Sequence, residues 1–371
     1  MADLSVAGAK VDITPPMGIA LDGYSARTNP SSGIHDRLYS RVLVLRTGGG
    51  MSAIISCDLC WLGGATVSEV RKKAKEAGVD ELILAATHTH SGPAVADFIV
   101  GPTQIEAGYV LSLPDLITGA IKDASQRLRP VTAEVRVGSA ALSINRRLGS
   151  LPVDPTVVTL NFRDDEGKPV AGILNYPCHP TVLGPPNRKV SADYPGKVSE
   201  LIEESHGNGF VSLFLNGACG DVNPSTCDGY HCEGTFADVS AMAQRLAGAS
   251  RNSSGKPFDP RDIRHMRSRI GPLPPWELSF ELTAMSLGGV ILLAAPGELF
   301  ASTGLFLRKT TSSPLMIAGF ANGYVGYFPT QDAFERRDYE TRRICWVDSS
   351  AEEVIRSEAS ALLERVGALA R

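Results

Sequence analysis

Residues 82–90 read LILAATHTH, so an apolar run leads directly into two histidines that one threonine separates. The run is short and apolar throughout, which is typical of a strand that is buried on both faces. His88 and His90 follow at its end, and two residues that lie two positions apart on an extended chain point to the same face. The segment therefore predicts a buried strand that brings a pair of imidazoles to one edge of a sheet.

Further apolar runs of this kind also end in small or polar residues. They cover residues 170–176 before His179, 211–215 before Asp221, 290–294 before Glu298 and 315–318 before Asn322. Open α/β sheets bind ligands and carry out chemistry at the carboxyl ends of their strands. The polar residues that follow the runs are therefore candidates for one common site.

The stretches between these runs have apolar residues at helical spacing. They cover residues 65–77, 116–128, 195–205, 236–249 and 351–370, with Pro195 as the first residue of its helix. No repeat or linker divides the chain, and residues 250–264 and 271–275 are predicted to form one long surface excursion. The sequence thus predicts a single α/β domain over residues 1–371, with buried mixed β-sheets covered by helices in a layered sandwich.

The composition is that of an ordinary globular protein. Of 371 residues, 43% are hydrophobic and 20% are charged, and the net charge is −4. The lack of a basic cluster argues against nucleic-acid binding. The N-terminus does not resemble a secretory signal, and apolar runs such as 290–296 are too short to cross a bilayer. With seven cysteines and no signal, the thiols are predicted to be reduced and the protein to be cytoplasmic.

Several familiar motifs are missing or ambiguous. No Gly-x-Gly-x-x-Gly follows a first strand and no Walker loop occurs, so a nucleotide cofactor is not supported. Gly-x-Ser-x-Gly is also absent, which argues against a serine hydrolase. Cys57 and Cys60 with Cys227 and Cys232 offer four thiols for a structural zinc site, but their spacing differs from that of zinc ribbons. Buried or incidental thiols are favoured.

Two histidines and a glutamate form a possible metal-binding set. Taken separately, each has a structural interpretation. His88 and His90 could be a hydrogen-bonded pair, and His179 could be a structural histidine. Glu298 could be a carboxylate at the start of an apolar helix over 299–307. Together, two histidines and a glutamate match the ligands of catalytic zinc, which leave one position open for water. Bound zinc lowers the pKa of that water to about 7 and polarises a carbonyl oxygen. The set therefore favours Zn²⁺ chemistry.

Three loop aspartates have two interpretations. Asp58, Asp193 and Asp221 could each orient a ligand histidine through a hydrogen bond, or could cap turns. The sequence leaves both open.

A series of short motifs, in this order along the chain, resembles the N-terminal catalytic domain of the neutral/alkaline ceramidase family. The motifs are AGAKVDITP (7–15), GIHD (33–36), LYSR (38–41), THTHSGP (87–93), Asn145-Arg146, residues 175–181, GDV (220–222), PGE (296–298), Tyr327 and Tyr339. The resemblance implies that His88, His179, Glu298 and Tyr327 bind zinc, with Tyr324 as the alternative to Tyr327. It also implies that His90 handles protons, and that Arg146 and Tyr339 contact the scissile carbonyl or its oxyanion.

The chain departs from the family pattern in three respects. Asn223 occupies the position of the serine that contacts substrate in ceramidases, although its amide could still donate a hydrogen bond to a carbonyl or oxyanion. The C-terminal immunoglobulin-like domain of the long enzymes is expected to be missing. A secretion signal and an apolar loop for docking to a membrane are not evident either. These departures argue against ceramide itself as the substrate.

The sequence therefore predicts a zinc-dependent hydrolase that cleaves a C–N amide bond with metal-activated water. The expected partner is a small N-acyl or cyclic amide, with no nucleic acid and no transmembrane segment, and the oligomeric state is left open. The alternatives are an esterase or lactonase on the same centre, a true ceramidase, or an inactive metal-binding homologue.

Overall fold

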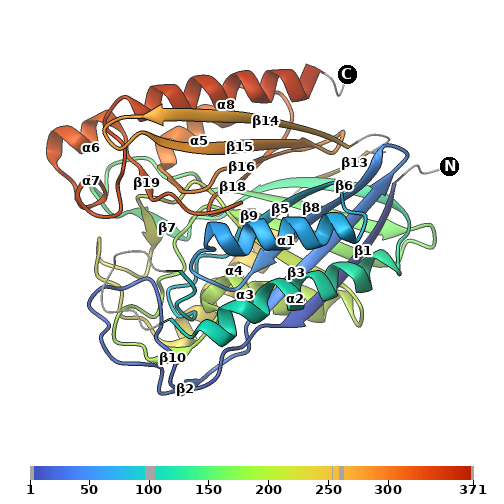
Figure 1. The fold of residues 1–371 in the computed structure, drawn as a ribbon, viewed down its shortest axis with the longest axis horizontal. Coiled ribbons are helices and arrows are strands. Elements are labelled where there is room, and N and C mark those ends of the chain that lie inside the picture. The colour runs from blue at the N-terminus through green and yellow to red at the C-terminus, as the bar shows by residue number, and fades with distance from the viewer. Residues whose placement is uncertain (1–3, 97–104, 253, 259–262, 369–371) are drawn as a thin grey trace.

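The computed structural model describes residues 4–96, 105–252, 254–258 and 263–368 (Figure 1). In chain order the elements are β1 (Ser5–Asp12), β2 (Gly33–Ile34), β3 (Tyr39–Thr47), β4 (Gly50–Cys57), α1 (Gly64–Glu76), β5 (Glu81–Ala86), α2 (Ala107–Ser125), β6 (Arg129–Ser139), β7 (Ser143–Asn145), β8 (Thr156–Asp164), β9 (Pro169–Tyr176), β10 (Lys189–Val190), α3 (Asp193–His206), β11 (Val211–Asn216), β12 (Val222–Pro224), α4 (Phe236–Arg251), β13 (Ser254–Phe258), β14 (Arg264–Leu273), β15 (Leu278–Ser286), β16 (Ile291–Ala294), β17 (Glu298–Leu299), α5 (Ala301–Arg308), β18 (Leu315–Ala318), β19 (Tyr327–Phe328), α6 (Gln331–Arg336), α7 (Tyr339–Arg342) and α8 (Ala351–Ala368).

Two sheets form the centre of the molecule. The larger has nine strands in the order β11-β9-β8-β6-β1-β3-β4-β5, with β13 paired to β6. It is mixed, because β4–β5 and β9–β11 are parallel pairs while β1–β3 and β8–β9 are antiparallel. The smaller sheet has four strands in the order β14-β15-β16-β18. All five apolar runs that were predicted to be strands are strands, namely β5, β9, β11, β16 and β18.

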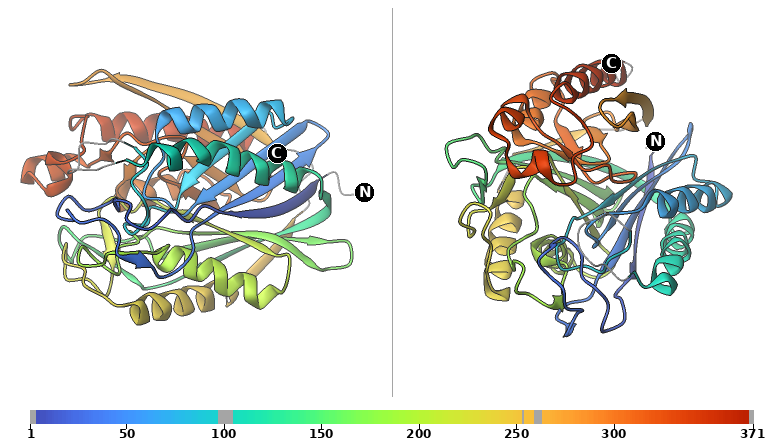
Figure 2. Two further views of the ribbon diagram at one scale, coloured as in Figure 1. Left: turned by 60° about the horizontal axis from the view of Figure 1, so that its bottom comes forward. Right: turned by 60° about the vertical axis from the view of Figure 1, so that its left-hand side comes forward.

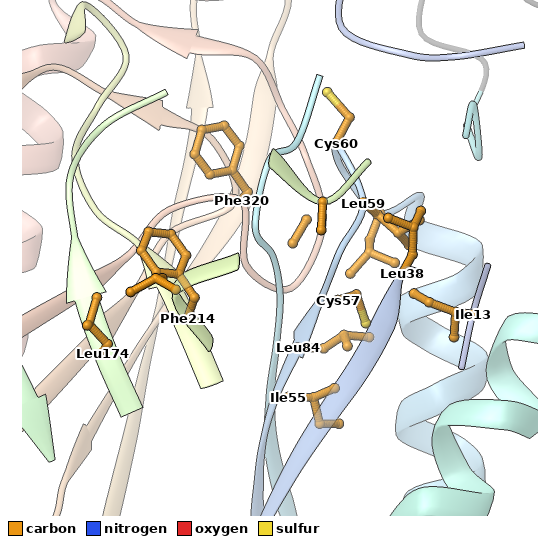
Figure 3. Packing of buried hydrophobic residues seen from close by; sticks show 14 of the residues in the cluster. Ile13, Leu38, Ile55, Cys57, Leu59, Cys60, Leu84, Leu174, Phe214 and Phe320 are labelled. Carbon is orange, nitrogen blue, oxygen red and sulfur yellow. The ribbon is translucent and has the colours of Figure 1, made fainter. Parts of the chain in front are cut away.

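The sheets and helices are stacked in layers. One hydrophobic core lies between the larger sheet and helices α1–α4, and Figure 3 shows part of it. A second core lies between the two sheets, and a third lies between the smaller sheet, α5 and α8. Figures 1 and 2 show the C-terminal third of the chain, coloured orange to red, on one side of the larger sheet. The prediction of a layered α/β sandwich is confirmed.

Several predicted boundaries differ from the structure. Helix α2 begins at Ala107 and includes Pro114, so it starts well before residue 116. Helix α3 begins at Asp193, two residues before Pro195. The last predicted helix ends at residue 370, and its final two residues lie outside the described part of the chain. The prediction of a long surface excursion is also wrong. Residues 254–258 and 264–273, which overlap the predicted excursion, pair into the sheets as β13 and β14.

The predicted helix over residues 299–307 is wrong at its start. Glu298 and Leu299 form β17, which pairs in parallel with β19, and α5 begins only at Ala301. The register places Glu298 opposite Tyr327. Glu298 is therefore fixed by a strand pair and is not a helix-terminal carboxylate.

Asn175 connects the two sheets through a fully buried side chain. Its Nδ2 donates to the carbonyls of Leu215, at 2.8 Å, and Ile317, at 2.7 Å, and its Oδ1 accepts from the Ile317 amide at 3.2 Å. Leu215 belongs to the larger sheet and Ile317 to the smaller one. Replacing Asn175 with leucine should therefore lower the free energy of unfolding by roughly 3 kcal/mol, because a buried polar group without a partner costs about 1–3 kcal/mol. Urea denaturation checks this, with Asn208→Leu in an exposed turn as the control; equal midpoints for the two variants would contradict the role of Asn175.

Among the described helices, none combines the length and the apolar character that a bilayer crossing requires.

Candidate active site

Three side chains from distant parts of the sequence meet at one buried point. His88 follows β5, His179 follows β9, and Glu298 lies in β17 just after β16. Their ligand atoms all lie within 4.8 Å of one another, and no side chain is more than 2% exposed. Glu298 Oε2 is 3.0 Å from His179 Nε2 and 3.8 Å from His88 Nε2. The structure therefore brings together the two histidines and the glutamate that the sequence singled out.

Backbone carbonyls orient both imidazoles. His88 Nδ1 donates to the carbonyl of Cys60 at 2.7 Å, and His179 Nδ1 donates to the carbonyls of Cys219, at 2.7 Å, and Val222, at 3.0 Å. Because Nδ1 carries the proton, each Nε2 presents a lone pair toward Glu298. Metal-binding histidines are fixed by outer partners in this way.

The electrostatics of this point fit a cation. Burial lowers the pKa of His88 and of His179 to about 3, so both imidazoles are neutral, as metal ligands must be. Burial also raises the pKa of Glu298, and its Oε2 has no hydrogen-bond partner in the described chain. A carboxylate oxygen and two imidazole lone pairs are all acceptors, so none of these three atoms can donate a hydrogen bond to another. A divalent cation satisfies all three groups at once.

The two histidines of the His-x-His motif converge for a different reason from the one predicted. Strand β5 ends at Ala86, and His88 has a φ of 69°, which is a left-handed conformation. Strand alternation therefore does not place the pair on one face. The turn nevertheless brings His90 Nε2 to 3.1 Å from His88 Nε2. Such backbone strain in a non-glycine residue is concentrated at functional sites.

Both candidate tyrosines approach Glu298, and they do so differently. Tyr324 donates to Glu298 Oε1 at 2.5 Å, which is the carboxylate oxygen turned away from the histidines. The hydroxyl of Tyr327 accepts from Arg146 Nη2 at 3.0 Å. Burial raises the pKa of Tyr327 well above its usual value, as does the charge of Glu298, while the guanidinium of Arg146 lowers it. Both hydroxyls therefore lie near Glu298, and that of Tyr327 also has the Arg146 guanidinium beside it.

Arg146 is buried and its guanidinium spans the site. Its Nε donates to Glu340 Oε1 at 2.7 Å, and its Nη2 donates to the Gly220 carbonyl at 2.8 Å. Its Nη1 lies 3.4 Å from His179 Nε2. Glu340 is fully buried and received no role from the sequence, although it directly follows Tyr339 in the last motif of the series. The chain thus holds one planar, permanently charged donor beside the candidate metal ligands.

Asn223 turns its amide nitrogen away from this centre. Its Nδ2 donates to the Gly229 carbonyl at 2.9 Å and to Cys232 Sγ at 3.6 Å, while its Oδ1 faces Arg146 Nη1 at 3.4 Å. In this orientation the amide holds a neighbouring loop and Arg146. Its predicted role as an oxyanion donor stays a prediction.

Cys227 and Cys232 close that loop as a disulfide. The prediction that all cysteines are reduced is therefore wrong for these two, while Cys57, Cys60, Cys178, Cys219 and Cys345 are free thiols. The predicted alternative of a four-cysteine zinc site is excluded, since two of its thiols are bonded to each other. Neighbours in space cannot be inferred from cysteine spacing alone.

The same loop carries Tyr230 to the mouth of the site. Its hydroxyl donates to Glu340 Oε2 at 3.1 Å, and the Arg146 guanidinium lies 5.4 Å from its ring centre. Tyr339 is 39% exposed, and its ring lies 5.8 Å from that of Tyr230 and 6.4 Å from that of Tyr327. No signal in the sequence distinguished Tyr230 from other loop tyrosines.

The three loop aspartates cap and pair, and none bonds a ligand histidine. Asp58 forms an ion pair with Arg41, Asp193 accepts from the Tyr194 amide, and Asp221 accepts from the Ala301 amide at the start of α5. The capping interpretation is correct for Asp193 and Asp221, whereas Asp58 pairs with an arginine. The histidine-orienting interpretation is wrong, because backbone carbonyls already hold both Nδ1 atoms.

His90 is the remaining imidazole at this point and can act as a proton acceptor. Burial, together with the neighbouring His88 and His179, lowers its pKa well below the usual value, so it is neutral. The arrangement therefore places a three-residue cation site, a neutral base, a fixed guanidinium and a phenol within one buried cluster. Together these groups can activate water and stabilise negative charge on a carbonyl oxygen.

Comparison with known proteins shows that the chain is similar to ceramidases. Residues 5–271 match the family described as "Neutral/alkaline non-lysosomal ceramidase, N-terminal". The neutral ceramidase of Pseudomonas aeruginosa is 29% identical over 244 residues, which cover 58% of this chain and 36% of that protein. Neutral ceramidase A of Dictyostelium discoideum is 25% identical over 292 residues, which cover 68% of this chain and 41% of that protein. The match spans little more than a third of the length of these relatives.

Solved structures show the same fold. The crystal structure of the Pseudomonas aeruginosa neutral ceramidase superposes with a TM-score of 0.83 at 19% identity, covering 98% of this chain and 75% of that one. A structure described as ceramidase complexed with C2 gives a TM-score of 0.84 at 19% identity. The family match ends at residue 271, so Glu298, Tyr327 and Tyr339 lie beyond it, whereas the structural likeness extends over the part that contains them.

Proposed function

Because this chain belongs to the neutral/alkaline non-lysosomal ceramidase family, we propose that it is a zinc-dependent hydrolase of a C–N amide bond. Glu298 Oε2 carries the proposal: it is a buried oxygen without a hydrogen-bond partner among the described residues, and the Nε2 atoms of His88 and His179 face it. His88, His179, Glu298 and Tyr327 would hold the ion. When bound, zinc acidifies a water molecule and polarises a carbonyl.

The chain's own residues supply the remaining steps. His90 accepts a proton from water and returns it to the leaving nitrogen, as a general base and then a general acid. Arg146, held by Glu340, and Tyr339 donate to the carbonyl oxygen as it becomes negative. Asn223 keeps Arg146 in place through its amide oxygen. We further propose that residues 1–371 act as one catalytic domain, since strands from both ends of the chain share the core between the sheets.

The proposed substrate is a small N-acyl or cyclic amide. Asn223 differs in chemistry from the serine that the resemblance places there, and its donors are bonded to the disulfide loop. The relatives are named ceramidases, so a long-chain sphingoid amide belongs in every assay beside short-chain amides.

The direct test combines metal analysis with matched substrates. The full chain would be reconstituted with zinc, its bound metal counted, and its turnover measured on pairs of amides and esters that differ in one atom. One zinc per chain with amide turnover supports the proposal. Ester turnover alone identifies an esterase, and stoichiometric zinc with no turnover of any compound would identify a metal-binding homologue without catalysis.

The tyrosine ligand can be identified by spectroscopy. A phenolate bound to Fe³⁺ or Cu²⁺ produces a visible charge-transfer band, so either ion can replace zinc as a probe. We expect Tyr327→Phe to lose this band and Tyr324→Phe to keep it, because only Tyr327 has Arg146 beside its oxygen. The absorption spectra of both variants check this, and the reverse pattern would assign the ligand to Tyr324.

A further inference from the structure

Four buried polar atoms, on His90 and on a loop that contacts it, have no hydrogen-bond partner in the described chain. They are Asp22 Oδ2, Tyr24 Oη, Arg27 Nε and His90 Nδ1, and we call them the Asp22 cluster. The loop after Leu21 supplies three of them, and the proposed function uses only the opposite nitrogen of His90. Each such atom costs about 1–3 kcal/mol if it stays unpaired. Four such atoms on one loop and on the imidazole that it contacts indicate that a further polar group binds there.

Packing holds the cluster firmly against His90. The Tyr24 ring lies 4.8 Å from the His90 ring, and the Arg27 guanidinium lies 4.9 Å from the Tyr24 ring. Arg27 Nη1 donates to the carbonyls of Asp22, at 3.0 Å, and His90, at 2.8 Å. At Gly23, where φ is 94°, a Cβ atom would lie 2.4 Å from the His90 ring, so no larger residue fits between loop and imidazole. The loop over residues 22–27 is thus held in place against His90.

The Asp22 carboxyl is the most buried polar group of this loop. It is 3% exposed, and its Oδ1 accepts from the neighbouring Gly23 amide at 3.1 Å, with the Trp61 side chain also close to the carboxyl. Burial, the larger effect, raises the pKa of Asp22 to about 7, while Gly23, Arg27 and Trp61 lower it. A hydrogen bond from a donor strongly stabilises the ionised form of such a buried carboxyl.

The Asp22 cluster and Arg146 contact different residues of the site. Arg146 contacts His179, Asn223 and Tyr327, whereas the Asp22 loop contacts His90 through the Tyr24 ring and Arg27. In the proposed reaction the acyl oxygen faces Arg146, and the leaving nitrogen faces His90. The substituent on that nitrogen therefore extends toward the Asp22 cluster.

We propose that Asp22, with Tyr24, is a specificity-determining residue that binds a hydrogen-bond-donating substituent, a hydroxyl or an ammonium group, on the amine side of the substrate. This inference rests on the proposed function for the direction in which the amide lies. An apolar substituent would leave Asp22 Oδ2 without a hydrogen-bond donor from the substrate. Sites built to bond a polar group reject analogues that lack it.

Three amides of nearly equal size test the inference. N-Acetylethanolamine, N-acetylethylenediamine and N-propylacetamide end in a hydroxyl, an ammonium and a methyl group. Their binding to the full chain, freed of metal by a chelator so that no turnover occurs, can be compared by ligand-observed NMR. We expect at least one polar amide to bind about tenfold or more tightly than N-propylacetamide, as the loss of one hydrogen bond to a charged group implies. The stronger of the two identifies the favoured donor.

Two variants separate recognition from folding. Asp22→Asn keeps the size of the side chain and the bond from Gly23, and Tyr24→Phe keeps the ring against His90 while removing its hydroxyl. We expect Asp22→Asn to reduce the preference to within about threefold, and Tyr24→Phe to reduce it in part. Binding of N-propylacetamide should stay unchanged in both. Equal binding of the three amides to the unaltered chain, or an unchanged preference in Asp22→Asn, would overturn the inference and leave ordered water as the occupant.

Turnover by the zinc-loaded chain is measured separately. Discrimination by the metal-free chain without any hydrolysis by the zinc-loaded chain would contradict the proposed function and support the Asp22 site. Hydrolysis with no preference among the three amides would support the function and contradict the site.

Discussion

Replacing His88 with alanine should abolish zinc binding and hydrolysis together. His88 Nε2 is one of two neutral imidazole nitrogens that face Glu298 Oε2, and the turn that carries it is held by bonds to residues 59 and 60. Loss of an outer partner of a ligand typically lowers metal affinity by about 10–100-fold, so loss of the ligand itself should lower it further. Glu298→Gln should have a similar effect, because an amide cannot supply the negative charge.

Metal content, turnover and thermal unfolding measure this result. In the unaltered chain, zinc at about 1,000 times its dissociation constant should stabilise the fold by roughly 4 kcal/mol, because only the folded state holds the site. The His88→Ala variant should show no such shift. His206→Ala is the matched control, since His206 stacks on Phe210 away from the site. Full zinc and full turnover in His88→Ala would falsify the assignment of the metal ligands.

Replacing Arg146 with lysine should lower kcat by about 10²–10³-fold while zinc stays bound. Lysine keeps the charge but cannot donate to Glu340, Gly220 and Tyr327 from one planar group. Removal of one donor to a developing oxyanion has an effect of this size. Because the donor acts on the charge that forms during the reaction, KM should change less than kcat.

The neighbouring arginine gives a control with similar surroundings. Arg147 is also enclosed and paired, but its partners are Asp221, Asp332 and Asp338, away from the three ligand side chains. Arg147→Lys should therefore change stability without the same loss in kcat. If Arg146→Lys retained kcat within about threefold, with zinc bound and the fold intact, Arg146 would have no part in the chemistry.

Asn223 does more than put an amide at the position of the family's serine, because it also contacts the disulfide loop. The amide of Asn223 binds Gly229 and Cys232, and that loop in turn brings Tyr230 to Glu340. Glu340 holds Arg146. A residue at the substrate-contact position of the motif thus supports the guanidinium through a chain of contacts, which a motif comparison does not reveal.

The strands, most helices and the layered α/β class could be predicted from the sequence, because burial on both faces and helical periodicity are local properties. The five apolar runs were recognised for this reason, and all are strands. The candidate ligands His88, His179 and Glu298 could be named because few residue types bind zinc, and each of these three follows such a run.

Only the tertiary structure decided how these residues meet. Glu298 begins an apparent helix in the sequence, yet it forms a strand pair with Tyr327, and this long-range pairing overrides local helical periodicity. His88 faces His90 through a left-handed turn that strand periodicity does not anticipate. The different positions of Tyr324 and Tyr327, the bonds from Glu340 to Arg146 and the unpaired atoms around Asp22 depend on contacts between segments far apart in the chain. Local sequence patterns record what each segment forms by itself, whereas the convergence of side chains follows from packing between segments, and that is why the site's geometry required the fold.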